Sequence, residues 1–442
     1  MDIRELQNIL QQNGIVGAGG AGFPTYMKIT DKAEVILLNC AECEPLLKLH
    51  QQLLESHAHD IMSTFYLFAQ TMGAAEAVIG IKRAYSRTVE ALNQYISEFP
   101  GMRIHLLDEV YPMGDEVVLI YEATHRVVRP GGLPIEQGVA VFNVETIYNA
   151  YRAISAGKPV TDKYISIVAE VEKPVTVRVP LGCTLDEAVA CAGRPTVKDP
   201  VYFVGGPMMG RIGRGSEPVT KTTNAVLVLP ADHGIVTKKN RTSAIDLKRA
   251  ASICCQCNTC TDLCPRHALG HPIDPARFMR AASNQDFRDM NPYVNAAFCC
   301  SCGVCEMYAC PQSLAPRTLL ADMKAGLRKA GVKPPAGVVP KPVKQEREYR
   351  KVPEERLMAR LGLTKYDRPA PMDETLVPVR RVEILLSQHI GAPAVPQVKI
   401  GDQVTRGQQI AAPGQGLSVG IHASICGTVT DVTDRHIVIE AK

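Results

Sequence analysis

Two cysteine-rich runs constrain what this chain can fold into more than any other part of its sequence. Ten of the fifteen cysteines lie in the segments 254–265 and 299–311. The first segment has the spacing C-x2-C-x2-C-x3-C-P, and the second has C-x2-C-x2-C-x4-C-P. Three thiolates spaced three residues apart, on a loop that wraps around a cofactor, can bind three irons of a cubane cluster. The runs therefore predict a helical module built around two [4Fe–4S] clusters.

In two-cluster ferredoxins the fourth cysteine of such a run binds the cluster of the other run. The ligands predicted on this pattern are Cys254, Cys257, Cys260 and Cys310 for one cluster, and Cys299, Cys302, Cys305 and Cys264 for the other. The extra residue before Cys310 could change which of the two clusters Cys310 binds, but it does not change the set of eight ligands. Zinc sites, the alternative, use two C-x2-C pairs or mixtures of cysteine and histidine, which these runs do not match. Cys255 and Cys300 are not expected to be ligands.

Length and composition indicate an intracellular protein with several domains. A chain of 442 residues exceeds what one hydrophobic core usually holds, so three or four modules are expected. Forty-nine basic and forty-five acidic residues give no argument for binding nucleic acid. No apolar run approaches the roughly 18 residues that a membrane helix needs, and the N-terminus lacks the apolar segment of a secretory signal. We expect a cytoplasmic protein without a transmembrane segment, in which disulfides are rare.

A glycine-rich loop, "GIVGAGGAGFPTY" (residues 14–26), matches the dinucleotide-binding pattern G-x-G-x-x-G. That pattern needs a buried strand before it and a helix directly after it. Here residues 3–10 have helical periodicity, Gly14 is placed as a helix C-cap residue, and Phe23-Pro24 follows the loop. We interpret the loop as a cradle of backbone amides for a phosphate or a ring, not as a Rossmann NAD site. A purely structural glycine turn is the alternative.

Two iron–sulfur clusters in one module indicate transfer of single electrons. Clusters of this kind do no substrate chemistry themselves, so another group must supply their electrons. A flavin can divide a hydride into single electrons, and the glycine loop is the candidate flavin site.

Five stretches occur in order before the cysteine runs: "GAGGAGFPTYMK" (17–28), "NCAECEP" (39–45), "YPMGDE" (111–116), "FNVETIYN" (142–149) and "GGPMMG" (205–210). Together with the runs they resemble the RnfC family and, more remotely, the flavin- and NADH-binding subunit of respiratory complex I. This resemblance implies FMN as a cofactor and NADH as the electron donor. The residues that it implies for binding FMN or NADH are Gly17, Gly19, Gly20, Ala21, Gly22, Phe23, Lys28, Asn39, Glu42, Glu44, Gly114, Asp115, Glu116, Asn143 and Thr146. Complex I has an aspartate where this chain has Ala41.

Strand and helix patterns support a multidomain α/β plus β architecture. Short apolar runs at 33–40, 74–82 and 139–144 alternate with helical patterns, which favours a layered, Rossmann-like α/β domain over residues 1–160. Residues 161–235 resemble the soluble-ligand-binding β-grasp (SLBB) module of the family, with Thr184 and Glu187 spaced as a capping box. Such modules have been proposed to bind cobalamin. The two-cluster ferredoxin-like domain is expected at 245–330.

The last part of the chain combines a linker with a second β module. Residues 331–376 are rich in proline and charge and suit an extended linker. Residues 377–442 alternate short apolar runs with glycine turns and resemble a barrel-sandwich hybrid, as in RnfC. The tip expected at 422–427 has no lysine, so this module is expected to dock or to support structure, not to carry a swinging arm. RnfC has this module at its N-terminus, whereas here it comes last.

That permuted order resembles the cobalamin reductases associated with bacterial microcompartments for 1,2-propanediol utilisation. The resemblance implies an enzyme that passes electrons from NADH through FMN and two [4Fe–4S] clusters to cob(III)alamin or cob(II)alamin. Cobalamin, a cobalamin adenosyltransferase, and microcompartment shell or lumen proteins are the implied partners, and an oligomer is possible. The alternatives are an RnfC-like electron-input subunit of a membrane complex, or a passive electron carrier that serves another reductase or a glycyl-radical activase.

Overall fold

A parallel sheet with helices on both faces forms the first domain of the computed structural model, which describes residues 1–441. Its elements are α1 (Ile3–Gln12), η1 (Thr25–Lys28), β1 (Val35–Cys40), α2 (Leu49–Met72), β2 (Glu76–Lys82), α3 (Ser86–Asn93), β3 (Met102–Leu107), β4 (Val110–Tyr111), α4 (Glu116–Thr124), β5 (Val139–Asn143) and α5 (Val144–Ala156). The sheet has the order β3-β2-β1-β5, and every neighbouring pair is parallel.

The apolar runs of this sheet are continuous because both of its faces are covered. Ile36 and Leu38 belong to one core together with residues of α2 and α5, whereas Leu37 belongs to a second core together with residues of α4. At the carboxyl ends of the strands, Asn39 of β1 lies beside Asn143 of β5. Ligands of open parallel sheets bind at this edge.

The second domain is a mixed sheet with one short helix. Its elements are β6 (Asp162–Ala169), β7 (Val175–Pro180), α6 (Leu185–Ala190), β8 (Pro200–Val204), β9 (Arg211–Gly213) and β10 (Ala225–Pro230). Helix α6 starts with the expected capping box, in which Thr184 and Glu187 bond to each other's backbone amides. Antiparallel β6 and β7, the helix, and the parallel pairing of β10 with β6 give the β-grasp arrangement.

Residues 331–376 differ from the expected extended linker, because tertiary contacts fold part of this segment. Strand β11 (Val352–Pro353) pairs with β4, and β12 (Met372–Leu376) adds to the edge of the β-grasp sheet beside β7. Between them lies α14 (Glu354–Leu361). Its Leu357 and Leu361 enter a core that the β-grasp domain shares with the helical domain of the two cysteine runs, called the cluster domain from here on. The segment therefore ties three domains together.

Short helices enclose the two cysteine runs. The elements of this domain are α7 (Gly234–Lys239), α8 (Ser243–Ile253), α9 (Thr259–Asp262), α10 (Pro265–Ala268), α11 (Pro275–Ser283), α12 (Asn291–Val294), η5 (Val304–Ala309) and α13 (Pro316–Lys329). Proline at the start of α10, α11 and α13 suits the first turn of a helix.

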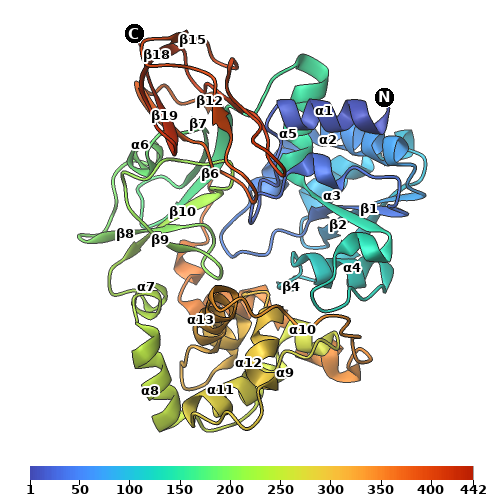
Figure 1. Cartoon of the computed structure of the whole chain (residues 1–442), viewed down its shortest axis with the longest axis vertical. Coiled ribbons are helices and arrows are strands. Elements are labelled where there is room, and N and C mark those ends of the chain that lie inside the picture. The colour runs from blue at the N-terminus through green and yellow to red at the C-terminus, as the bar shows by residue number, and fades with distance from the viewer. Residues whose placement is uncertain (442) are drawn as a thin grey trace.

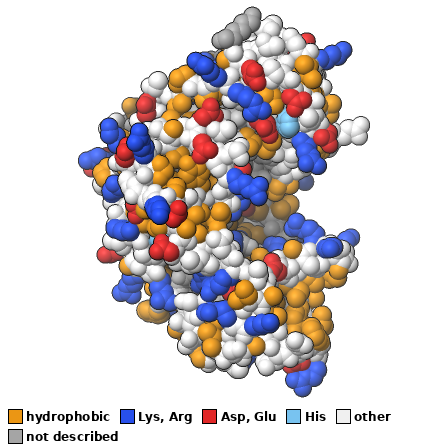
Figure 2. All heavy atoms as spheres, turned by 90° about the vertical axis from the view of Figure 1, so that its left-hand side faces the viewer, with side chains coloured by type: hydrophobic (Ala, Val, Ile, Leu, Met, Phe, Trp, Pro, Cys, Tyr) orange, Lys and Arg blue, Asp and Glu red, His pale blue; other side chains and the backbone are white. Residues whose placement is uncertain are grey.

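The C-terminal domain consists of two small antiparallel sheets around one apolar core. Its strands are β13 (Arg381–Leu385), β14 (Val395–Pro396), β15 (Gln403–Val404), β16 (Gln409–Ala412), β17 (Ile421–His422), β18 (Gly427–Val432) and β19 (His436–Glu440). Figure 1 shows this domain and the cluster domain at opposite ends of the molecule, with the first domain and the β-grasp domain between them. In the space-filling view of Figure 2, the surface is hollowed between the cluster domain below and the domains above it.

Candidate active site

A cavity of about 410 Å³ lies where the first, β-grasp and cluster domains meet. This volume falls within the range of about 300–1,000 Å³ that is typical of small-molecule and cofactor sites. Of the fifteen residues expected to bind FMN or NADH, fourteen line it: Gly17, Gly19, Gly20, Ala21, Phe23, Lys28, Asn39, Glu42, Glu44, Gly114, Asp115, Glu116, Asn143 and Thr146. Gly22 does not line it. That residue is on the side of the loop that packs against Thr222 and Gln388.

The glycine loop is held in shape by its own backbone and by α5. The Gly17 amide donates to the Phe23 carbonyl oxygen (2.9 Å), and the Ala18 amide donates to Thr146 Oγ1 (2.9 Å). Helix α1 precedes the loop, and residue 16 forms only an isolated bridge, so no strand leads into Gly17. The arrangement leaves a turn of backbone at the cavity wall and differs from a Rossmann NAD motif.

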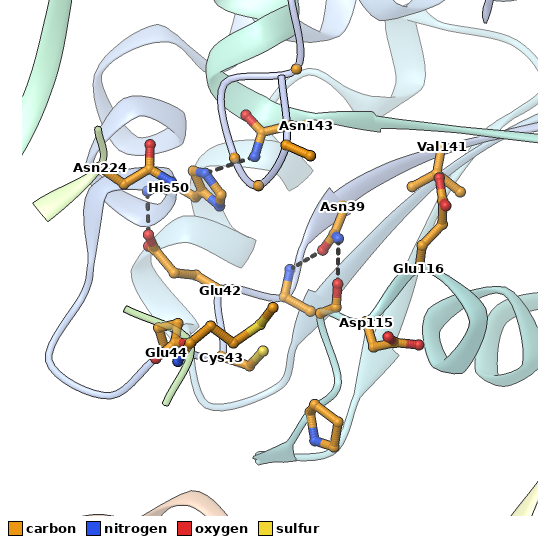
Figure 3. A pocket seen from close by; sticks show the side chains of 18 of the residues that line it. Asn39, Glu42, Cys43, Glu44, His50, Asp115, Glu116, Val141, Asn143 and Asn224 are labelled. Carbon is orange, nitrogen blue, oxygen red and sulfur yellow. Dashed lines mark hydrogen bonds between the residues drawn. The ribbon is translucent and has the colours of Figure 1, made fainter. Parts of the chain in front are cut away.

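Residues at the end of β1 and just after it form the floor of the cavity (Figure 3). Asn39 Nδ2 donates to the Gly114 carbonyl oxygen (2.9 Å), and Asn39 Oδ1 accepts from the Ala41 amide (3.2 Å). Glu42 Oε2 accepts from the backbone amide of His50 at the start of α2 (3.0 Å). These bonds fix the backbone of residues 39–42 against the loop that carries Gly114.

Glu44 reaches toward the β-grasp domain. Its carboxylate accepts from the amides of Met208 (2.9 Å) and Met209 (3.0 Å). Burial raises the pKa of Glu44 to about 7, although both amides and the Lys239 ammonium act to lower it. The carboxyl can therefore gain or lose a proton near neutral pH. An added Cβ on Gly206 would lie 2.2 Å from Glu44 Oε2, so the close approach requires glycine there.

Charged residues line the side of the cavity at α4. Lys28 Nζ donates to the Val141 carbonyl oxygen (2.8 Å) and lies 3.4 Å from Glu116 Oε1. Asp115 caps α4 by accepting from the amides of residues 117 and 118, and it pairs with Arg266 Nη2 of the cluster domain (2.8 Å). Asp115 thus joins the first domain, which holds most of the expected flavin-binding residues and is called the flavin-type domain from here on, to the cluster domain.

Two polar side chains in this cavity had not been expected from sequence. His50 Nε2 lies 3.0 Å from Asn143 Nδ2, and Asn143 Oδ1 caps α5 by accepting from the Thr146 amide. Among residues 1–441, His50 Nδ1 and Asn224 Oδ1 are buried without a hydrogen-bond partner. Both residues line the cavity, so a bound cofactor can supply the missing partners. No local pattern marks either residue. His50 lies in the first turn of α2, and Asn224 comes to the cavity from the β-grasp domain.

The cysteines gather around two smaller cavities in the cluster domain. Cys254, Cys257, Cys260 and Cys310 line one, and Cys264, Cys299, Cys302 and Cys305 line the other. Within residues 1–441, no three His, Cys, Asp or Glu side chains converge closely enough to hold a single metal ion. Each quartet surrounds a volume, and four thiols of this type suit a [4Fe–4S] cluster.

The group of Cys254, Cys257, Cys260 and Cys310 is called the first quartet, and the group of Cys264, Cys299, Cys302 and Cys305 is called the second quartet. The cavity of the second quartet shares a wall with the cavity of about 410 Å³, called the flavin-type cavity from here on. Cys300 and Cys302 line both cavities, and the Tyr111 hydroxyl donates to the Cys302 carbonyl oxygen (2.6 Å). Cys302 and Cys305 are buried, whereas Cys257 of the first quartet is exposed. The second quartet therefore adjoins the flavin-type cavity, and the first quartet reaches the surface at Cys257.

Comparison with known proteins finds a separate family match for each of three parts of the chain. Residues 10–152 match the Nuo51 FMN-binding domain, residues 253–315 match a 4Fe-4S dicluster domain, and residues 367–442 match the RnfC barrel sandwich hybrid domain. Cobalamin reductase PduS of Salmonella typhimurium is 40% identical over 98% of this chain and 96% of its own length. Cobalamin reductase PduS of Citrobacter freundii is 38% identical over 99% of this chain and 97% of its own length. The chain belongs to the PduS family.

Two further proteins resemble parts of this PduS-family chain. One component of the Na(+)-translocating ferredoxin:NAD(+) oxidoreductase complex of Acetobacterium woodii is 29% identical over 63% of this chain and 61% of its own length. The structure of an NAD+-reducing [NiFe]-hydrogenase in the H2-reduced state matches with a TM-score of 0.52 at 20% identity. That match covers 76% of this chain and 64% of the hydrogenase chain, and it shows likeness of fold.

The family domains and the site geometry together identify the cofactors. The chain has an FMN-binding domain and a domain for two [4Fe–4S] clusters. In residues 1–441 no helix is both long and apolar enough to cross a membrane.

Proposed function

We propose that this chain is a reductase that takes electrons from NADH and delivers them singly to cobalamin. Bound FMN would supply the chemistry that accepts a hydride and releases its electrons one at a time. The observation that carries the proposal is the wall shared by the flavin-type cavity and the second cysteine quartet, formed by Cys300 and Cys302. The acceptor is taken from the PduS relatives, which are named cobalamin reductases.

The chain's own residues would divide the work of holding the cofactor. The backbone of residues 17–21 would contact the ring or phosphate of FMN, with Lys28 supplying positive charge nearby. Asn143, His50 and Asn224 offer hydrogen-bonding groups beside this loop. Glu44 would hold or release a proton at the wall of this cavity near neutral pH, since its pKa is about 7.

Electrons would then cross the cluster domain from inside to outside. The quartet of Cys264, Cys299, Cys302 and Cys305 adjoins the flavin-type cavity and would receive electrons first. The quartet that contains the exposed Cys257 would pass them to the acceptor. Oxidation of one NADH to NAD+ and a proton releases two electrons, which reduce two molecules of cob(III)alamin to cob(II)alamin.

The test is anaerobic oxidation of NADH by protein that contains flavin and both clusters. We expect NADH to bleach the flavin and then the clusters, and to reduce hydroxocobalamin at two equivalents per NADH. Bleaching without reduction of hydroxocobalamin would show that cobalamin is not the acceptor. An absence of bleaching, with clusters that dithionite reduces, would reject NADH as the donor.

One observation favours a second candidate, a passive electron carrier. Ala41 is buried in the cavity floor and has no carboxylate, whereas complex I has an aspartate at the matching position. A carrier would accept electrons from another reductase and need not bind NADH. The bleaching experiment separates the two functions, because only the reductase is bleached by NADH alone.

We further propose that the protein works in the cytoplasm, inside a bacterial microcompartment. Resemblance to the microcompartment cobalamin reductases supports this proposal. Shell or lumen proteins and a cobalamin adenosyltransferase would be its partners there. Co-purification of the chain with intact microcompartments would test the location.

A further inference from the structure

A second large cavity lies in the cluster domain, which is the domain at the bottom of Figure 1. It has a volume of about 490 Å³ and lies between the loop 267–274, helices α11 and α12, and the returning segment 341–344. The Lys341 amide donates to the Gly270 carbonyl oxygen (2.9 Å), and the Lys344 amide donates to the Ala268 carbonyl oxygen (2.9 Å). None of the described residues that line it also lines the flavin-type cavity or either cysteine cavity. It is a separate site.

A buried imidazole in this cavity has an unused hydrogen-bond acceptor. His271 is only 3% exposed, and its Nε2 lies 2.9 Å from the Val128 carbonyl oxygen. Because a carbonyl only accepts, Nε2 carries the hydrogen and Nδ1 carries a lone pair. Nδ1 has no partner among residues 1–441. Buried polar atoms are normally paired, so this atom indicates a ligand group that donates a hydrogen bond.

The same cavity is lined with positive charge. Lys344 Nζ donates to His267 Nε2 (2.6 Å), and the Lys341 ammonium has no ion pair within residues 1–441. Arg277 also lines the cavity, with Asp289 as its salt-bridge partner. A ligand that fits these groups must carry negative charge, and lysine and arginine are the usual binders of phosphate.

The acid at the cavity wall is already engaged. Asp274 Oδ1 accepts from Thr261 Oγ1 (2.6 Å) and from the Arg277 amide (3.0 Å), where it caps α11. Within residues 1–441 the carboxylate forms no salt bridge with Lys341, Lys344 or Arg277, so it does not occupy the two lysines.

Helix α11 connects this cavity to the iron–sulfur sites. Ala276 and Met279 line the cavity of the first quartet, Pro275 lines that of the second, and Arg277 lines the new cavity. A molecule bound here would lie across one helix from both quartets. That position suits an electron acceptor.

We propose that this cavity binds the phosphate-bearing part of the electron acceptor, through Lys341 and Lys344 on the phosphate and His271 on a donor group. Its identification with cobalamin rests on the proposed function. The nucleotide loop of cobalamin carries a phosphodiester, and its amide side chains donate hydrogen bonds. A free nucleotide offers the same two kinds of group, so the experiment must separate these two sources.

The experiment is equilibrium dialysis of the protein, with its clusters and flavin, against three probes. These are cyanocobalamin, dicyanocobinamide (which lacks the nucleotide loop) and ATP. We expect Lys341→Gln and Lys344→Gln each to weaken cyanocobalamin binding about tenfold, the usual effect of losing one charge-assisted bond. Asn295→Asp, which adds negative charge to the cavity wall, should act in the same direction. Lys333→Gln, an exposed lysine outside the cavity, should have no effect.

Dicyanocobinamide should bind more weakly than cyanocobalamin and should respond to neither cavity lysine. Loss of ATP binding alone in the cavity variants would support the phosphate site and identify a free nucleotide as its ligand. The proposal would be overturned if the variants bound each of the three probes as strongly as the wild type does. Reduction of hydroxocobalamin by the wild type is measured in parallel. Its absence would reject the proposed function, whereas its presence with unchanged binding in the variants would reject this site alone.

Discussion

Protonation of Glu44 is expected to affect how strongly the cavity binds its ligand. Its side chain lines the flavin-type cavity, and burial raises its pKa to about 7. Below that pH the carboxyl is neutral, and above it the carboxyl is anionic. Rising pH therefore adds negative charge to a cavity that is proposed to admit NADH, itself an anion. In the wild type, the NADH concentration for half-maximal flavin bleaching should rise between pH 6 and pH 8.

Replacing Glu44 with glutamine removes this ionisation. In Glu44→Gln we expect the half-saturating NADH concentration to be nearly constant from pH 6 to pH 8. The wild type should change by roughly fivefold, as expected for a repulsion of about 1 kcal/mol. Anaerobic flavin bleaching at a series of NADH concentrations and pH values measures both. Glu90→Gln, an exposed change on α3, should keep the wild-type dependence; an unaltered profile in Glu44→Gln would exclude this carboxyl as the titrating group.

At the scale of elements, the glycine loop is clamped by two domains that lie outside the flavin-type domain. Gly22 has φ of +71°, and an added Cβ would lie 3.0 Å from Thr222 Cγ2 of the β-grasp domain and 3.1 Å from the Gln388 carbonyl oxygen of the C-terminal domain. The buried Lys221 ammonium donates to the carbonyl oxygens of Gly14 (2.8 Å) and Gly420 (3.2 Å). The C-terminal domain therefore supports the cavity wall without lining it.

Alanine at position 22 should displace the loop from this clamp. We expect Gly22→Ala to be purified with less than half of the wild-type flavin, while its iron content is unchanged. Gly73→Ala is the matched control, because Gly73 has a similar φ of +68° at the end of α2 but no atom within 4 Å of an added Cβ. Both variants therefore carry similar backbone strain. Flavin and iron analysis compares them, and equal flavin loss in both would show that strain, not the clamp, is responsible.

The elements also show which features sequence could predict. Strands at 35–40, 76–82 and 139–143 were predictable because an apolar run covered on both faces carries its own signal. The capping box at Thr184 is equally local. Strand β12 was not predictable from sequence, because its sequence "MDETL" has no clear apolar alternation and the strand forms only against the edge strand β7. Asn224 could not be predicted as a site residue either, because its position in the cavity depends on how two domains pack.

At the scale of the whole molecule, the order of the three cofactor cavities determines what each cysteine variant should lose. The two quartets mix cysteines from both runs, so Cys264 of the first run lies with the quartet beside the flavin-type cavity, and Cys310 of the second lies with the outer quartet. Removing one ligand of a four-thiolate cluster should release that cluster and leave the other in place.

We therefore expect Cys264→Ala and Cys310→Ala each to retain about half of the iron, yet to behave differently with NADH. In Cys310→Ala the inner cluster remains next to the flavin, so NADH should reduce both the flavin and one cluster. In Cys264→Ala the flavin should still bleach, but the remaining outer cluster should stay oxidised because the group between them is missing. Electron paramagnetic resonance after NADH addition distinguishes the two, and dithionite verifies that each remaining cluster is reducible. The reverse result, with a cluster reduced by NADH in Cys264→Ala and none in Cys310→Ala, would mean that each run binds its own cluster, because the inner cluster would then survive the loss of Cys264.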